Sequence, residues 1–249
     1  MLLPARIAIS FLTILPMGLP AALPAEGFRR SAAFFPLAGW LLGAILAGLA
    51  ALFHLLHLPP LLAAVLLVAA LAWLTRGLHL DGLADLLDGL GGGQDPARRL
   101  AIMKDSALGV FGGVGLVLLL VLKIASLAAL LVRGPELLWP LLAAPVAARW
   151  SMAVLAWNTE YPRSQGTGHA FVGRVGPGQL LGGFLFLLPL FWWGGLSALA
   201  VVVFSLVPAW WLRRKARKAL GGVTGDVLGA ACEMGEACAW LAAVAVCSL

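Results

Sequence analysis

Long apolar runs alternate with short polar segments along the whole chain. A helix needs about 20 predominantly apolar residues to cross about 30 Å of hydrocarbon. Seven runs are near that length, and each is predicted to be a transmembrane helix, because a helix satisfies its own backbone hydrogen bonds in lipid. The seven predicted spans are residues 34–56, 59–74, 108–132, 137–157, 178–193, 196–212 and 227–246.

The N-terminal segment 1–19 is also apolar, but prolines and Arg6 interrupt it. This pattern favours an interfacial or re-entrant helix over an eighth span. The sequence as a whole therefore predicts an all-α integral membrane protein, in which residues 1–249 form a single polytopic membrane domain.

Composition agrees with a bilayer environment. Hydrophobic residues make up 62% of the chain and charged residues 11%, whereas soluble domains carry roughly 25% charged residues. The net charge of +6 does not indicate nucleic acid, because the basic residues lie in the short loops, where lysine and arginine set topology. The expected partners are membrane lipid and small molecules, with no nucleic acid, and the oligomeric state stays open.

The basic residues are distributed very unequally between the two ends of the predicted spans. If loop 76–107 is cytoplasmic, only Arg133 lies on the opposite side. Thirteen lie on the loop's side: Arg29, Arg30, Arg76, Arg98, Arg99, Lys104, Arg163, Arg174, Arg213, Arg214, Lys215, Arg217 and Lys218. The positive-inside rule then predicts that this side faces the cytoplasm, and the expected location is the cell (inner) membrane, as a multi-pass protein. The loop acids share this side and Glu136 is external, so the active site is expected at the cytoplasmic face.

Three aspartates, Asp81, Asp85 and Asp88, recur at i, i+4 and i+7 after the second span. On a helix they fall within about 60° of one another, on one narrow face. Like charges at this spacing repel, so a positive partner is expected. Mg²⁺, bound through carboxylates and substrate phosphates, is the natural candidate. The alternative is a solvated acidic segment beside a span, but charges near a bilayer are costly and usually functional.

Further polar segments lie on the same side as the aspartates. One contains Arg98, Arg99, Lys104, Asp105 and Ser106, and another opens the last span with Thr224 and Asp226. A third, residues 163–171, is glycine-rich and by itself is more typical of a turn. The basic run 213–218 is more typical of a topology and lipid-headgroup signal.

Two cations, Lys123 and Arg149, lie inside predicted spans. Such residues are costly in hydrocarbon and usually face the bundle interior. Lys123 is too deep for an obvious phosphate contact, so a structural partner or snorkelling is at least as good an interpretation.

Three motifs occur in a familiar order: Gly-Leu-His79-Leu-Asp81-Gly-Leu-Ala-Asp85-Leu-Leu-Asp88-Gly, then Ile-Met-Lys104-Asp105-Ser106, then Thr224-Gly-Asp226-Val-Leu-Gly-Ala. Together they resemble the cobalamin-5'-phosphate synthases, also called adenosylcobinamide-GDP ribazoletransferases. The segments Phe11–Pro16 and Phe35–Gly39 fit the same family, so the likeness covers nearly the whole chain.

The resemblance implies transfer of the adenosylcobinamide phosphoryl group from adenosylcobinamide-GDP to α-ribazole or its 5'-phosphate, with release of GMP. Mg²⁺ would be the cofactor, since a diphosphate needs charge neutralisation. The implied metal ligands are Asp81, Asp85 and Asp88, completed by Asp105 and Asp226. Phosphate and substrate binding would fall to Lys104, Arg98, Arg99, Ser106 and Thr224. The implied catalytic residues are His79, Asp88 and Lys104, with the proton acceptor left open between His79 and an aspartate.

Two other functions compete with this one. A CDP-alcohol phosphotransferase should carry D-x-x-D-G-x-x-A-R, but Asp88-Gly is followed here by Leu90-Gly-Gly-Gly. A secondary transporter should show two related halves with broken helices near mid-membrane, and no such repeat is evident in the sequence.

Overall fold

The computed structural model describes residues 2–134 and 138–247, so the predicted external Glu136 lies outside the described residues. Within those ranges the chain is helical and contains no strand, which confirms the all-α prediction. The helices are α1 Leu2–Leu12, α2 Ala25–Ser31, α3 Phe35–Leu55, α4 Pro60–Leu74, α5 Leu78–Gly92, α6 Pro96–Ile102, α7 Val110–Leu131, α8 Trp139–Ala156, α9 Pro177–Leu185, α10 Leu188–Leu220 and α11 Gly225–Val246, with 3₁₀ turns η1 Ala32–Phe34 and η3 Thr167–Ala170.

Five of the described helical segments are long and apolar enough to cross a membrane, or six if the bent pair α4 and α5 forms one span. The predicted spans all coincide with helix, but span 178–193 is divided between α9 and the start of α10. Neither part is long enough to cross alone, and α4, with 15 residues, is counted only together with α5, so these two differences explain the lower count. The predicted break at 194–195 is confirmed, because Gly195 has the non-helical angles φ 52° and ψ −132°.

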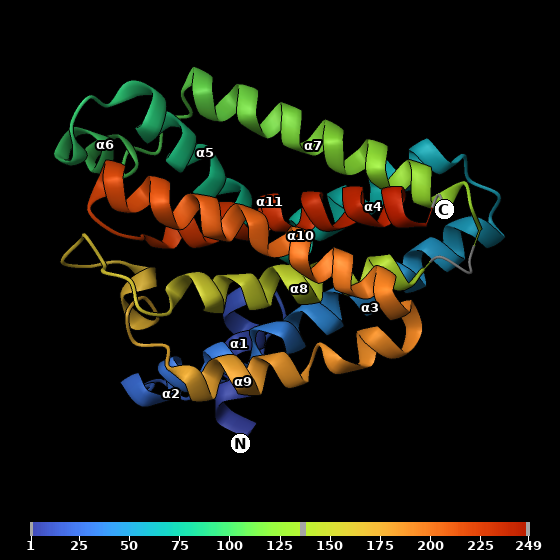
Figure 1. Ribbon diagram of the computed structural model, residues 1–249, viewed down its shortest axis with the longest axis horizontal. Coiled ribbons are helices and arrows are strands. Elements are labelled where there is room, and N and C mark those ends of the chain that lie inside the picture. The colour runs from blue at the N-terminus through green and yellow to red at the C-terminus, as the bar shows by residue number, and fades with distance from the viewer. Residues whose placement is uncertain (1, 135–137, 248–249) are drawn as a thin grey trace.

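The N-terminal helix α1 has only 11 residues, about half the length that a full crossing requires. It is nevertheless part of the fold, since Ile7, Ala8 and Leu12 are buried and α1 contacts α2 and α3. Figure 1 shows α1 beneath α3, at the edge of the bundle.

Helices α8 and α11 form the centre of the bundle. In each, 78% of the most apolar stretch is buried, against 22% for α7 and 28% for α10. Helix α11 packs against α5, α7, α8 and α10, and Figure 1 shows it crossing the middle of the molecule. The exposed side chains of α7 and α10, among them Val117, Leu118, Val203 and Phe204, suit contact with lipid.

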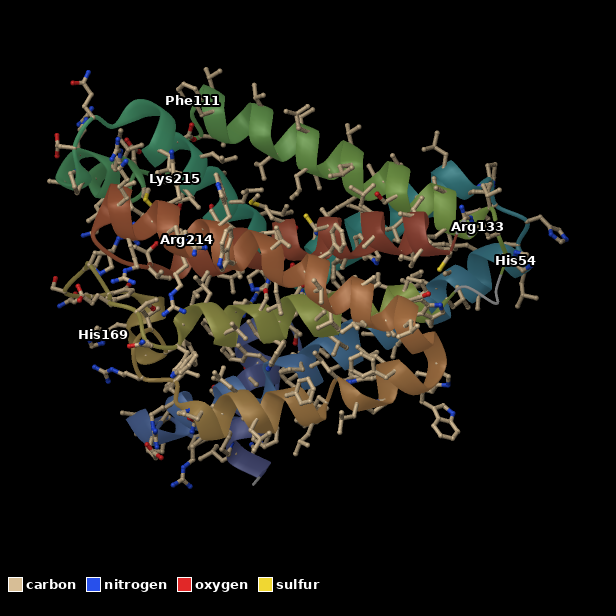
Figure 2. All side chains as sticks on the ribbon, in the orientation of Figure 1. His54, Phe111, Arg133, His169, Arg214 and Lys215 are labelled. Atoms are coloured by element: carbon tan, nitrogen blue, oxygen red, sulfur yellow. The ribbon has the colours of Figure 1, made fainter. Side chains whose placement is uncertain are left out.

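The two ends of the bundle differ in charge. Figure 2 shows Arg214, Lys215 and His169 at one end and Arg133 and His54 at the other. Helices α5 and α6 and the loop between α8 and α9 lie at the Arg214 end (Figure 1). The polar segments singled out in the sequence therefore gather at one end.

A cluster of four charges lies inside the bundle. Lys123 of α7 is paired with Glu236 of α11 at 2.7 Å and also with Glu233, and Arg149 of α8 is paired with Glu236. All four side chains are at most 4% exposed. The charges of the two cations and the two carboxylates sum to zero, so the group can be accommodated in a low-dielectric interior. Lys123 therefore has a structural partner, as one of the two interpretations of its sequence position expected.

Replacing Glu236 by alanine should strongly destabilise the protein. The change removes the carboxylate that Lys123 and Arg149 share, and breaking a buried pair from one side costs about 3–5 kcal/mol. The measurement is the melting temperature in detergent. Glu26→Ala is the control, because Glu26 pairs with Arg29 and Arg30 at the surface and exposed pairs contribute little. Equal melting temperatures for the two variants would contradict the conclusion that the buried charge cluster stabilises the fold.

Candidate active site

A sharp bend between α4 and α5 positions the aspartate-bearing helix. The two helices meet at 89°. The turn uses left-handed backbone at Arg76, with φ 56°, and at Gly77, with φ 64°. Glycine adopts such angles without a steric penalty, so Gly77 allows α5 to leave the line of α4 and lie against α11.

Glycines allow α5 and α11 to approach closely. A Cβ atom at Gly82 would lie 2.9 Å from Cα of Asp226, and one at Gly229 would lie 3.2 Å from Cα of His79. The approach brings Asp226, near the start of α11, beside the aspartates of α5. Asp85 lies within electrostatic reach of Asp81, Asp226 and Asp88, and Arg163 opposes these negative charges. Asp81, Asp85 and Asp226 are therefore the carboxylates that the fold gathers.

Two side chains hold Asp226 in place. The hydroxyl of Thr224 donates to its Oδ2 at 3.2 Å, and Arg163 is paired with the same oxygen at 2.8 Å. Thr224 is also the N-cap of α11, accepting from the backbone N–H of Val227. Within the described part of the chain, Nε and Nη2 of Arg163 are buried and have no hydrogen-bond partner. Buried donors of this kind are available to a phosphate ligand.

The loop that carries Arg163 packs around Tyr161. The Tyr161 hydroxyl donates to the carbonyl of Gln165 at 3.4 Å, and its ring meets His169 at 5.5 Å between centroids. Burial raises the pKa of Tyr161, so its phenol stays a neutral donor. The segment 163–171, which by itself is typical of a turn, thus brings a cation into the site.

Asp88 has a different environment from Asp81 and Asp85. Its two carboxylate oxygens accept hydrogen bonds of 2.8 Å from the backbone N–H groups of Gly109 and Gly112. These amides belong to the first turn of α7, where four N–H groups have no intrahelical acceptor. A carboxylate there also complements the helix dipole. Asp88 thus caps α7 and fixes it to α5.

The remaining predicted residues, on α6 and in the segment that follows it, lie apart from Asp81, Asp85 and Asp226. Asp88, Arg98 and Asp105 line a separate hollow of about 360 Å³, and Asp105 accepts from the N–H of Ala107 at 3.0 Å. Lys104 and Ser106 are exposed. The Arg99 guanidinium donates to the carbonyls of Gly93 and Ala219 at 3.0 and 3.1 Å, so it joins α6 to the end of α10.

Two hollows meet at Asp81. One is a cavity of about 220 Å³ lined by Phe11, Phe35, His79, Phe171 and Asp226 among others. The other is an open groove of about 660 Å³, whose lining includes Arg76, Ala84, Leu108 and Leu116. Asp81 lines both. A carboxylate shared by two hollows can face two substrates at once.

No group of three or more His, Cys, Asp or Glu side chains among the described residues stands close enough to hold a metal by itself. Mg²⁺ does not require such a group, since it is commonly bound by one or two carboxylates together with substrate phosphates and water. The carboxylates of Asp81 and Asp85 have no hydrogen bond or ion pair in the described part of the chain. Their unneutralised charge fits a divalent cation carried in with a phosphate.

Several site residues were not assigned a role from the sequence. Arg163 was detectable as a cation in a glycine-rich loop, but only the fold shows it at Asp226. Phe11, Phe35 and Phe171 come from three distant segments and meet with ring centroids 5.1 to 6.4 Å apart. Each belongs to a segment singled out in the sequence, but only the fold shows that the three rings meet.

Comparison with known proteins gives a consistent result. Residues 4–244 match the family model described as cobalamin-5-phosphate synthase. Similar proteins named adenosylcobinamide-GDP ribazoletransferase occur in Acinetobacter baumannii, with 39% identity over 94% of this chain and 93% of the relative, and in Ectopseudomonas mendocina, with 43% over 95% and 96%. The relative from Pseudomonas aeruginosa has the same name and is 43% identical over 96% of both chains. No solved structure matches the chain.

Replacing Gly82 by alanine should disturb the contact between α5 and α11. The added methyl group would meet the Asp226 backbone at 2.9–3.0 Å, and overpacking of this kind costs about 1–3 kcal/mol. Gly48→Ala in α3 is the matched control, because a Cβ there meets nothing within 4 Å. In melting experiments in detergent, Gly82→Ala should melt below the parent and Gly48→Ala at or above it. A parental melting temperature for Gly82→Ala would show that the two helices are not in such close contact.

Proposed function

The chain belongs to the cobalamin-5-phosphate synthase family, and from this premise we propose that it joins the two halves of a cobamide. It transfers the adenosylcobinamide phosphoryl group from adenosylcobinamide-GDP to a ribose hydroxyl of α-ribazole or α-ribazole 5'-phosphate. In balanced form, the hydroxyl oxygen bonds to the cobinamide-linked phosphorus, the P–O bond of the diphosphate breaks, GMP leaves, and the hydroxyl proton is taken up by a base. The product is adenosylcobalamin or its 5'-phosphate.

The meeting of two hollows at Asp81 is the observation that best supports this reaction. Transfer between two large substrates needs separate binding regions with the reacting groups at their border, since phosphoryl transfer depends mainly on positioning and charge stabilisation. The larger open groove suits the bulky donor, and the smaller cavity suits part of the acceptor. Arg163, with two buried N–H-bearing nitrogens unpartnered, is suited to a phosphate oxygen near Asp226.

Mg²⁺ is the proposed cofactor, held by Asp81 and Asp85 together with the diphosphate. When bound, it would neutralise charge on the phosphates and on the leaving GMP. Asp226, which Thr224 and Arg163 hold beside these carboxylates, completes the polar surface. Asp88 supports this surface by fixing α7 to α5, and Asp105 and Arg98 lie in the neighbouring hollow, where they could contact the nucleotide end of the donor.

Asp81→Asn and Asp85→Asn should each lower turnover by orders of magnitude, because the change keeps the shape and removes the charge, and metal charge stabilisation is worth several kcal/mol. The assay uses purified protein with adenosylcobinamide-GDP, α-ribazole and Mg²⁺, and follows GMP release. Both variants should fold, since they relieve repulsion between like charges.

The matched control for these variants is Asp95→Asn. Asp95 caps α6 by accepting from the N–H of Arg98, and asparagine caps a helix equally well, so activity should persist. Parental turnover by a folded Asp85→Asn protein would refute the metal site at Asp81 and Asp85, and the site would then have to be sought around Asp105 and Asp226. Failure of the parent to release GMP under any condition would instead refute the proposed reaction.

The proposed location is the inner membrane, with the site-bearing end in the cytoplasm. The support is the excess of lysine and arginine at that end, where Figure 2 shows Arg214 and Lys215. The guanidinium of Arg214 lies 3.6 Å from the ring centroid of Trp210. Tryptophan and arginine are both common at the headgroup level of a bilayer.

A cysteine introduced at position 133 should react with an impermeant maleimide applied to intact cells, and one at position 214 should not. The background for both is a variant with Cys232, Cys238 and Cys247 replaced by alanine. Labelling after membrane disruption checks that position 214 can react at all. Reaction at 214 but not at 133 in intact cells would invert the orientation.

A further inference from the structure

His79 is a buried imidazole whose ring nitrogens both lack a hydrogen-bond partner among the described residues. The residue is 1% exposed. Buried polar groups almost always have a partner, and leaving one without costs free energy. A Cβ atom at Gly229 would lie 3.2 Å from Cα and 3.3 Å from the carbonyl oxygen of His79, so the backbone that carries the imidazole is packed closely against α11.

His79 is one of the residues that line the 220 Å³ cavity, and most of the others are apolar residues or glycines. Phe171 lies between Phe11 and Phe35, with ring centroids 5.2 and 5.1 Å away, and Met152 closes another side. Aromatic and thioether walls suit a flat aromatic ligand. Among the side chains that line the cavity, the charged ones are Asp81 and Asp226, which belong to the active site.

The cavity therefore favours a ligand with an aromatic part inside and a polar part at the carboxylates. A guanine base suits the apolar part of the cavity less well, because guanine carries several donors and acceptors that the walls of Phe11, Phe35, Phe171 and Met152 would leave unpaired. The base of α-ribazole is a benzimidazole, whose only free polar atom is the ring nitrogen that is not bonded to ribose. That nitrogen accepts one hydrogen bond, and an imidazole has at least one N–H donor in each of its protonation states.

We infer that the cavity binds the benzimidazole base of the acceptor nucleoside, with the Phe11, Phe35 and Phe171 cluster as its wall and His79 donating a hydrogen bond to the free ring nitrogen. This inference rests on the proposed function, since it says where the acceptor of that reaction binds. The ribose then lies at the mouth of the cavity, beside Asp81 and Asp226. His79 acts in this arrangement as a specificity-determining residue and not as the base that takes the hydroxyl proton.

The test compares two nucleosides that differ at one atom: α-ribazole and its indole analogue, in which a C–H group replaces the free ring nitrogen. Dissociation constants are measured for both with the purified full-length protein in nanodiscs, without the donor. The parent should prefer α-ribazole by about 10-fold or more, because the indole leaves the buried His79 N–H without an acceptor. In His79→Leu the two dissociation constants should become equal, mainly because α-ribazole binds more weakly. His79→Gln keeps a donor and should retain part of the preference.

His54→Leu is the matched control, since His54 lies at the opposite end of the bundle (Figure 2), and it should keep the parental preference. If His79→Leu does not fold, the His79→Gln and parental ratios still decide the matter. Equal affinities of the parent for the two nucleosides, or an unchanged preference in His79→Leu, would overturn the inference. Binding is measured separately from transfer, so a protein that shows the His79-dependent preference but releases no GMP would refute the proposed reaction and leave the base site standing.

Discussion

The buried charge cluster of Lys123, Arg149, Glu233 and Glu236 is the constraint on which the rest of the bundle depends. In a membrane, apolar contacts between helices are hardly better than contacts with lipid, so apolar packing alone does not select one arrangement. The cluster does, because Glu236 must face α7 and α8 together to pair with Lys123 and Arg149. The rotation of α11 about its axis is thereby set, and with it the side on which Asp226, nearly three turns earlier, emerges.

The arrangement of the candidate active site follows from that orientation through α5. Gly229 and Asp226 of α11 lie against the face of α5 that carries His79 and Gly82. The two glycines have no side chain, so the backbones of the two helices come close together. Like charges on α5 and α11 are thus brought together against their repulsion, at a cost that the packing must offset. The only cation paired with them in the described part of the chain is Arg163. This excess of negative charge is the property on which the proposed Mg²⁺ site rests.

The sequence predicted those features that depend on period and composition. The lengths of the apolar runs predicted the helices and the break at Gly195. The i, i+4, i+7 spacing predicted that Asp81, Asp85 and Asp88 lie on one helix. The sequence did not show that Asp88 has a different role from Asp81 and Asp85. That role, the capping of α7, depends on a bend that brings residues 88 and 109 together. Glu233 and Glu236 were detectable as acids inside a span, i and i+3 apart, yet their partners lie more than 80 residues away. Pairings of that kind are properties of the packed bundle.

The position of Asp81 gives a physical reason for placing this chemistry in a membrane protein. The open groove beside it is lined by Leu108 and Leu116 as well as by Arg76, so one hollow offers both apolar and charged surface, as the proposed donor with its corrinoid body and its diphosphate requires. The smaller cavity on the other side has walls that include Phe11, Phe35 and Phe171, and electrostatic contacts beside apolar walls are stronger than in water. A soluble protein would have to build an apolar surface of this kind and then protect it from aggregation. A bilayer supplies lipid that can cover such a surface, so a membrane protein does not need to bury it.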